Sequence, residues 1–146
     1  MTRRLASMGC GVLLAVGATV GATNMETAQK PPSSSTGWTL PEDADTKKSP
    51  LQADPKVLAT GKSVFKDKCT KCHGSGGLGD GPDADPEHRE DMDLTNPKRA
   101  DRNSDGVVFY KVWNGRRKPK MPAFKEELSE QQVWSVVAYV QTLRKH

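Results

Sequence analysis

The 146-residue sequence has the length of one domain with flanking segments, and only 34% of its residues are hydrophobic. A small domain with so few core-forming side chains often needs a metal, a disulfide or a cofactor to be stable. The formal net charge is +4, of which Arg3 and Arg4 supply half. This small excess argues against a nucleic-acid-binding protein, because such domains usually carry a strong basic excess.

The N-terminus has the features of an export signal. Two arginines precede a short apolar run over residues 11–20, and residues 20–22 offer the small side chains of a cleavage site. We therefore predict a signal peptide over residues 1–22 and a periplasmic location. The alternative is an uncleaved segment that tethers the protein to the membrane. Cleavage would remove Cys10 and leave two of the three cysteines.

Residues 23–53 are rich in polar residues, Ser and Pro, which predicts a flexible tail or linker. The folded domain is expected over residues 54–146. Asp54 is a good helix N-cap and Pro55 suits the first helical position, so the first helix is predicted to begin here. It is expected to end within residues 66–69.

The remainder of the chain predicts loops and two further helices. Residues 74–105 are rich in Gly and acidic side chains and are expected to form loops. A second helix is predicted over residues 106–113, stopped by Asn-Gly. Residues 129–132 form a capping box for the last helix. Its apolar stripe consists of Val133, Val136, Val137, Val140 and Leu143. Because no segment alternates as a strand does, we expect an all-α fold.

The segment Cys69-Thr70-Lys71-Cys72-His73 follows the pattern C-x-x-C-H, which is a signature of covalent haem attachment. Two thiols about one helical turn apart can bond to the two vinyl groups of one porphyrin. The adjacent His73 is then placed to bind the iron as its proximal ligand. The motif therefore predicts one covalently bound haem c, held by Cys69 and Cys72.

The motif has three other interpretations. A structural zinc site would need a fourth ligand, and the remaining histidines, His88 and His146, form no second pair of ligands. A thioredoxin-like dithiol would need a βαβ context, which the sequence does not predict. A plain disulfide in an exported protein would leave His73 unexplained. Haem attachment is therefore favoured.

A second axial ligand would close the iron to small molecules, and thioether sulfur favours Fe(II). Three of the five methionines lie in the signal or tail, which leaves Met92 and Met121. Met121 lies in an irregular segment between predicted helices, with prolines on both sides that stiffen it. Met92 lies among three carboxylates, which would be costly to bury beside a haem. We therefore predict that His73 and Met121 are the iron ligands.

With these features, the chain resembles the class I mono-haem cytochrome c family. The resemblance covers about residues 55–145. It is carried by residues 69–73, 74–82, 93–95, 113–115, 121–124 and 133–140. The attachment motif is highly specific, and the order and spacing of the other segments add to it.

The resemblance implies a fold of a few helices around one haem. It also implies a close contact between the first and last helices, for which Gly61, Phe65 and Tyr139 are the matching residues. In this family a proline carbonyl accepts a hydrogen bond from the proximal histidine. Pro82 is the expected counterpart, with His73 as the donor.

The expected function is single-electron transfer between redox partners, and not enzymatic catalysis. The alternative is a haem enzyme or ligand sensor whose distal position is open or whose Met121 is displaced. Basic residues flank the attachment motif and precede Met121, namely Lys66, Lys68, Lys71, Arg116, Arg117, Lys118 and Lys120. These side chains form either a rim that steers an acidic partner protein or ordinary solvated surface charge.

Overall fold

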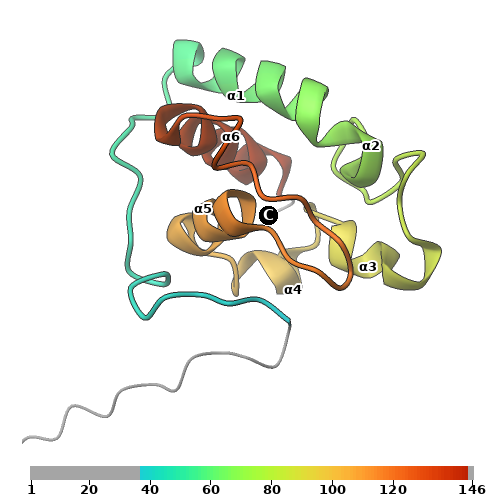
Figure 1. Cartoon of the computed structure of the whole chain (residues 1–146). Coiled ribbons are helices and arrows are strands. Elements are labelled where there is room, and N and C mark those ends of the chain that lie inside the picture. The colour runs from blue at the N-terminus through green and yellow to red at the C-terminus, as the bar shows by residue number, and fades with distance from the viewer. Residues whose placement is uncertain (1–36, 145–146) are drawn as a thin grey trace, which may run out of the picture. The chain divides into compact units, whose positions relative to one another are not determined.

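The computed structural model describes residues 37–144, which form helices joined by loops (Figure 1). In chain order the helices are α1 (Pro55–Lys68), α2 (Thr70–His73), η1 (Pro86–His88), α3 (Arg89–Met92), α4 (Pro97–Ala100), α5 (Asp105–Asn114) and α6 (Glu130–Leu143). No strand occurs among the described residues, so the prediction of an all-α fold is confirmed. The predicted signal peptide, residues 1–22, lies outside them.

Helix α1 begins where the local sequence predicts. The side chain of Asp54 accepts a hydrogen bond from a first-turn backbone N–H at 2.8 Å. Pro55 takes the first helical position, where its missing N–H needs no partner. Cys69 caps the other end and is also the N-cap residue of α2. Helix α1 therefore leads directly into the 69–73 motif.

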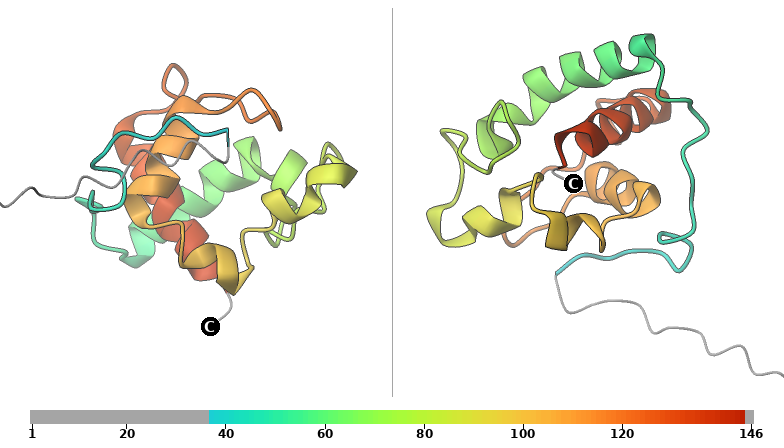
Figure 2. Two further views of the ribbon diagram at one scale, coloured as in Figure 1. Left: turned by 90° about the horizontal axis from the view of Figure 1, so that it is seen from below. Right: turned by 180° about the vertical axis from the view of Figure 1, so that it is seen from behind.

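Helices α1 and α6 lie side by side (Figure 2) and cross at Gly61. A Cβ atom at this position would lie 2.0 Å from the backbone oxygen of Ser135 and 2.9 Å from the Cβ of Tyr139. Only a glycine therefore permits this approach. The rings of Phe65 and Tyr139 pack with their centroids 5.3 Å apart. The expected contact between the first and last helices is confirmed.

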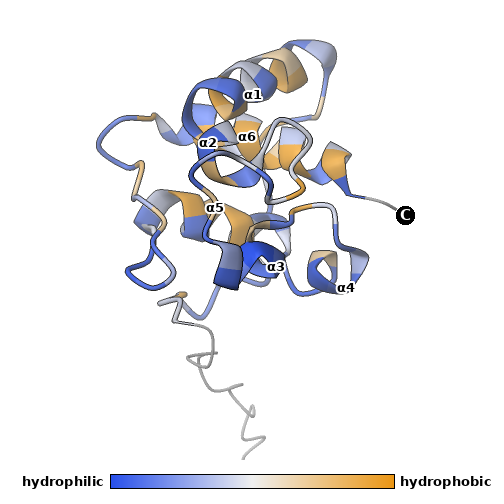
Figure 3. Ribbon diagram, turned by 90° about the vertical axis from the view of Figure 1, so that its right-hand side faces the viewer, coloured by the Kyte–Doolittle hydropathy of each residue, from blue (hydrophilic) through white to orange (hydrophobic). Residues whose placement is uncertain are grey.

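The core has one cluster where α5 and α6 pack together and another where α1 meets α6. Helix α6 begins at the predicted capping box, in which Ser129 and Gln132 satisfy each other's backbone N–H groups. The aromatic rings of Phe109 and Trp134 stack with their centroids 4.3 Å apart. Figure 3 shows the hydrophobic residues gathered on α1, α5 and α6, while α3 is mainly hydrophilic. The buried residues of α6 are Val133, Trp134, Ser135, Val136, Val137 and Val140.

Residues 74–105 were expected to form loops, and the structure corrects this in part. Three short helices, η1, α3 and α4, lie within this segment. Asp85 caps η1 and Asn96 caps α4, each directly before a proline at the first helical position. These are the same local signals that start α1, but each helix here is four residues or shorter. Such helices are too short to show an apolar period, so the pattern predicted loops.

The expected linker over residues 23–53 is wrong for the part that the structure describes. Residues 37–53, which we call the N-terminal strap, pack against α5 and its neighbours. Ala44 is only 3% exposed, and its carbonyl oxygen would lie 2.3 Å from a Cβ at Gly106. Lys47 donates a hydrogen bond to the hydroxyl of Tyr110 at 3.1 Å, and that hydroxyl donates to Asp43. The ordered domain therefore starts before residue 54.

Within residues 37–144, no helix combines the length and the apolar character that crossing a bilayer would require. The longest helices, α1 and α6, have 14 residues each.

Candidate functional site

The C-x-x-C-H motif forms one helical turn at the end of α1. The backbone N–H groups of Cys72 and His73 both donate to the carbonyl of Cys69, at 3.3 and 2.9 Å. Both thiols are free and half-buried. The structure therefore brings Cys69, Cys72 and His73 together in the local geometry that the sequence predicts.

The thiol of Cys69 is in a mainly apolar environment. Burial, followed by the charges of Cys72 and Asp67, raises its pKa to about 12. The sulfur is therefore protonated at neutral pH. An S–H group in this state is a poor thiol–disulfide exchange nucleophile, because the thiolate is the reactive form. It retains the proton needed when an S–H adds across a vinyl double bond to form a thioether.

The zinc interpretation finds no support among the described residues. The cluster of potential metal ligands found there consists of Asp85, Glu87 and His88, all outside the attachment motif. His88 instead lies 2.9 Å from the carboxylate of Asp85 through its Nδ1. No fourth donor joins the two cysteines and His73 in residues 37–144, as a structural zinc site would require.

His73 is held in the tautomer that suits a metal ligand. Its Nδ1 lies 2.7 Å from the backbone oxygen of Met92. A carbonyl can only accept, so Nδ1 carries the proton and Nε2 keeps its lone pair. Burial lowers the pKa of His73, and the hydrogen bond to Met92 opposes this only in part. The imidazole is therefore neutral at neutral pH, as iron ligation requires.

The structure corrects the role expected for Pro82. The carbonyl that accepts from His73 belongs to Met92, at the end of α3, and not to Pro82. Pro82 is exposed and lies in a loop bound to the outer side of α2, where the N–H of Asp83 donates to the carbonyl of Lys71 at 2.8 Å. A Cβ at Gly81 would lie 2.2 Å from that same carbonyl.

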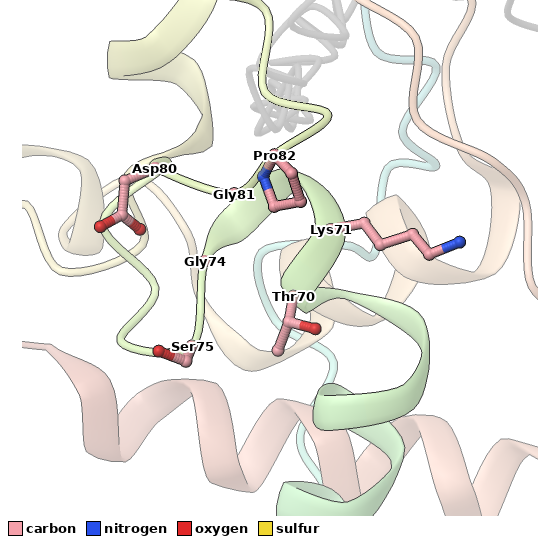
Figure 4. Close-up of a pocket in the computed structure, with 7 residues that line it drawn as sticks. All are labelled: Thr70, Lys71, Gly74, Ser75, Asp80, Gly81 and Pro82. Carbon is pink, nitrogen blue, oxygen red and sulfur yellow. The ribbon is translucent and has the colours of Figure 1, made fainter.

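An open cavity of about 360 Å³ separates part of this loop from α2 (Figure 4). Its lining residues are Thr70, Lys71, Gly74, Ser75, Asp80, Gly81 and Pro82. Because the loop is fixed to this side of α2, α3 supplies the acceptor for the histidine instead.

Met121 lies in the connection between α5 and α6, as predicted. Its backbone pairs with that of Arg116 through two hydrogen bonds of 2.9 Å, which close a turn over residues 116–121. Its side chain is half-buried against the core cluster that includes Phe109 and Phe124. Phe124 is itself fixed to α5, because its N–H donates to the carbonyl of Val112 at 3.1 Å. The sulfur is thus carried by a loop that is anchored at both ends.

Positive charge is concentrated beside these loops. Asp91 forms ion pairs with Arg99 and Arg116. Burial, followed by the charges of Arg116 and Arg99, lowers the pKa of Lys111 to about 8. The ring of Trp38 lies 5.1 Å from the Lys111 ammonium and 4.5 Å from the Arg116 guanidinium. Arg99, Arg116 and Lys111 thus lie near one another, and Asp91 pairs with the two arginines.

Sequence reasoning missed three of these contacts. The acceptor for His73 had no signal, because the carbonyl of any residue can accept. The Trp38 contact was hidden in a segment with the composition of a linker. Arg116 was noted only as one of several basic residues. The sequence sign of a fixed turn was the glycine directly before it. In the structure this residue, Gly115, has a φ of +62°, a conformation that favours glycine.

The donor set fits a covalently attached haem. Cys69 and Cys72 supply two free thiols on one helical turn, and His73 supplies a neutral imidazole with a free Nε2. These are the residues that would hold the haem and its iron.

Solved structures include a chain that is similar to this one. It belongs to the reducing HAO-like protein complex of Kuenenia stuttgartiensis and is 28% identical, with a TM-score of 0.53. The match covers 66% of this chain and 47% of the other, so this chain spans about half the length of the solved chain that it matches. No curated protein matches the sequence.

The family comparison covers the attachment motif, the Met121 turn and the last helix. The sequence model described as cytochrome c matches residues 58–144, from within α1 to the end of α6. This match spans more than half of the chain. The chain therefore belongs to the cytochrome c family, whose members carry covalently bound haem c.

Proposed function

We propose that this protein is a periplasmic mono-haem cytochrome that transfers single electrons, with the iron held by His73 and Met121. The sequence has one C-x-x-C-H motif, so we assign one haem, attached through Cys69 and Cys72. The haem would supply an iron that cycles between Fe(II) and Fe(III). The rest of the function follows from how the chain holds it.

The observation that carries the proposal is the 2.7 Å contact between Nδ1 of His73 and the backbone oxygen of Met92. This contact fixes the orientation of the ring and leaves the lone pair of Nε2 available to bind iron. Such a hydrogen bond also raises the basicity of Nε2, the nitrogen that would bind the iron. A rigid ligand is an advantage in electron transfer, because little needs to move when the iron changes charge.

The anchored loop of Met121 supports a closed distal side. Its turn is held by the backbone pairing with Arg116, and Phe124 fixes the following residues to α5. A thioether ligand from such a loop favours the reduced iron and excludes small molecules. An electron carrier needs both properties. A haem enzyme or ligand sensor, the alternative function, needs an open or displaceable distal position.

The charge distribution supports a protein partner with an acidic docking surface. Several basic side chains near the attachment motif and the Met121 turn are exposed to solvent: Lys66, Lys71, Arg117, Lys118 and Lys120. Lys68 is instead paired with Glu127 at 3.0 Å. The similar solved chain belongs to a protein complex, which agrees with a partner in general. We infer export from residues 1–22, with a membrane tether if they stay uncleaved.

The test is carbon monoxide binding by the reduced, haem-loaded protein. The wild type should bind carbon monoxide slowly and weakly, because Met121 occupies the distal position. Met121→Ala should bind it rapidly and lose reduction potential. Met92→Leu is the matched control, since it removes the other candidate sulfur and leaves the backbone carbonyl that holds His73. It should behave as the wild type does.

Two results would contradict the proposal. Rapid, tight carbon monoxide binding by the wild type would mean an open iron and would favour the enzyme or sensor. If Met92→Leu opened the distal position and Met121→Ala did not, Met92 and not Met121 would be the distal ligand.

A further inference from the structure

Arg116 begins the turn that carries Met121, and its side chain reaches α3, the helix whose last residue orients His73. Its side chain is only 9% exposed, although arginine is seldom buried without paired partners. Its backbone N–H and carbonyl both pair with Met121, at 2.9 Å each. The main chain of Arg116 is therefore part of the distal loop, while its guanidinium extends to other partners.

The guanidinium of Arg116 contacts both its own turn and helix α3. Nε donates to the carbonyl of Pro119 at 3.0 Å, which ties the interior of the 116–121 turn to its start. One terminal nitrogen reaches Asp91 at 3.5 Å. Asp91 is also held by Arg99, so its carboxylate is a fixed partner.

Asp91 directly precedes the residue that orients the proximal histidine. The backbone oxygen of Met92 is the acceptor for Nδ1 of His73. A short path of contacts therefore runs from the distal loop to the proximal ligand through the Arg116 and Asp91 ion pair. The Trp38 ring, 4.5 Å from the guanidinium, covers it and limits its exchange with water.

We propose that Arg116 is a positioning residue that holds Met121 at the iron and couples the distal loop to the α3 segment that orients His73. The inference rests on the proposed function, because it assumes that these two residues are the axial ligands. Without the guanidinium, the two backbone hydrogen bonds to Met121 remain, but the interior of the turn loses its internal tie and its anchor on Asp91. Met121 should then leave the iron more readily.

The experiment compares three variants of the full, haem-loaded protein. Arg116→Gln removes the charge and most of the reach, and Asp91→Asn weakens the same ion pair from the other side. Arg117→Gln is the matched control, because Arg117 is the exposed neighbour of the same type. The readouts are the absorption signature of methionine-ligated ferric haem and the carbon monoxide binding rate of the reduced protein.

The expected result is that Arg116→Gln weakens the signature and raises the carbon monoxide binding rate about tenfold or more, as loss of a charge-assisted hydrogen bond predicts. Asp91→Asn should act in the same direction to a smaller extent, and it carries the test if Arg116→Gln does not fold. Arg117→Gln should match the wild type. A purely structural role would lower the melting temperature and leave the signature unchanged.

Two failures can be told apart. If the wild type shows the methionine signature and Arg116→Gln and Asp91→Asn both keep it with unchanged carbon monoxide binding, the inference is wrong and the proposed function stands. If the wild type itself lacks the signature, the proposed axial ligation is wrong, and the inference falls with it.

Discussion

The crossing of α1 and α6 at Gly61 offers a quantitative test of the fold, through the substitution Gly61→Ala. The new methyl group would meet the backbone oxygen of Ser135 at 2.0 Å, its carbonyl carbon at 2.6 Å and the Cβ of Tyr139 at 2.9 Å. Two of these atoms belong to the backbone and the third is a Cβ, so no side-chain rotation relieves the clash. The helices would have to move apart by about 1 Å, which also loosens the Phe65 contact with Tyr139.

The expected magnitude combines two opposing effects. Forcing an extra methyl group into a packed interface costs about 1–3 kcal/mol, and a clash with backbone belongs at the upper end. Alanine is the better helix former by about 1 kcal/mol, which offsets part of this cost. We expect a net loss of about 2 kcal/mol in the free energy of unfolding, or roughly 8–16 °C in the melting temperature of a domain of this size.

Thermal unfolding of the haem-loaded protein, followed by circular dichroism, measures this loss. Ser63→Ala is the matched control, because Ser63 is exposed in the same helix and reports the helix-propensity gain alone. A melting temperature for Gly61→Ala equal to or above that of the wild type would refute the close crossing.

Three further predictions concern the strap, the half-buried Lys111 and the last helix. Lys111→Met should stabilise the protein by about 2 kcal/mol at neutral pH. The reason is that Lys111 has a pKa of about 8, so at neutral pH the folded state must hold its half-buried side chain in the charged form, which costs free energy. This advantage should shrink as the pH rises from 8 to the ordinary pKa of 10.5, and a pH-independent difference in urea unfolding would contradict it. Trp38→Ala should lower the free energy of unfolding by about 1–3 kcal/mol, through lost packing and cation–π contacts. If urea unfolding gave the same free energy of unfolding for Trp38→Ala as for the wild type, the strap would not contribute to stability. Ser129→Ala should cost about 1 kcal/mol, while Ser129→Asp should restore most of it.

The parts of the fold that the sequence predicted well depend on local chemistry. The starts of α1 and α6 follow from a capping side chain and the two or three residues after it, at Asp54 and Ser129. The apolar stripe of α6 spans 14 residues, which is long enough for a helical period to be recognised.

The N-terminal strap was not predicted, because its stability comes from residues distant in the sequence. Its ordered contacts are single side chains without any period, such as Ala44 beneath Gly106 and Lys47 on Tyr110. Composition describes how much apolar area a segment could bury, but not whether a neighbouring surface is shaped to receive it. The strap also lies before residue 58, where the cytochrome c match begins.

The site divides in the same way. The C-x-x-C-H motif is contiguous, so five residues are enough to predict haem attachment, and membership of the cytochrome c family agrees with that prediction. The partner of His73 comes from Met92, and the ion pair of Arg116 comes from Asp91, across separations of 19 and 25 residues. Both depend on how the 74–105 segment folds, and that segment was expected to be loops. The error at Pro82 has this same origin.

The most direct test of the central claim is the mass of the exported, denatured protein, measured together with a redox titration of its visible spectrum. We predict that each chain retains the mass of one haem after denaturation and that it titrates as a single one-electron centre. Cys69→Ser combined with Cys72→Ser should release the haem on denaturation. A wild-type chain that loses its haem when denatured, or that titrates as more than one centre, would contradict a single haem held by Cys69 and Cys72.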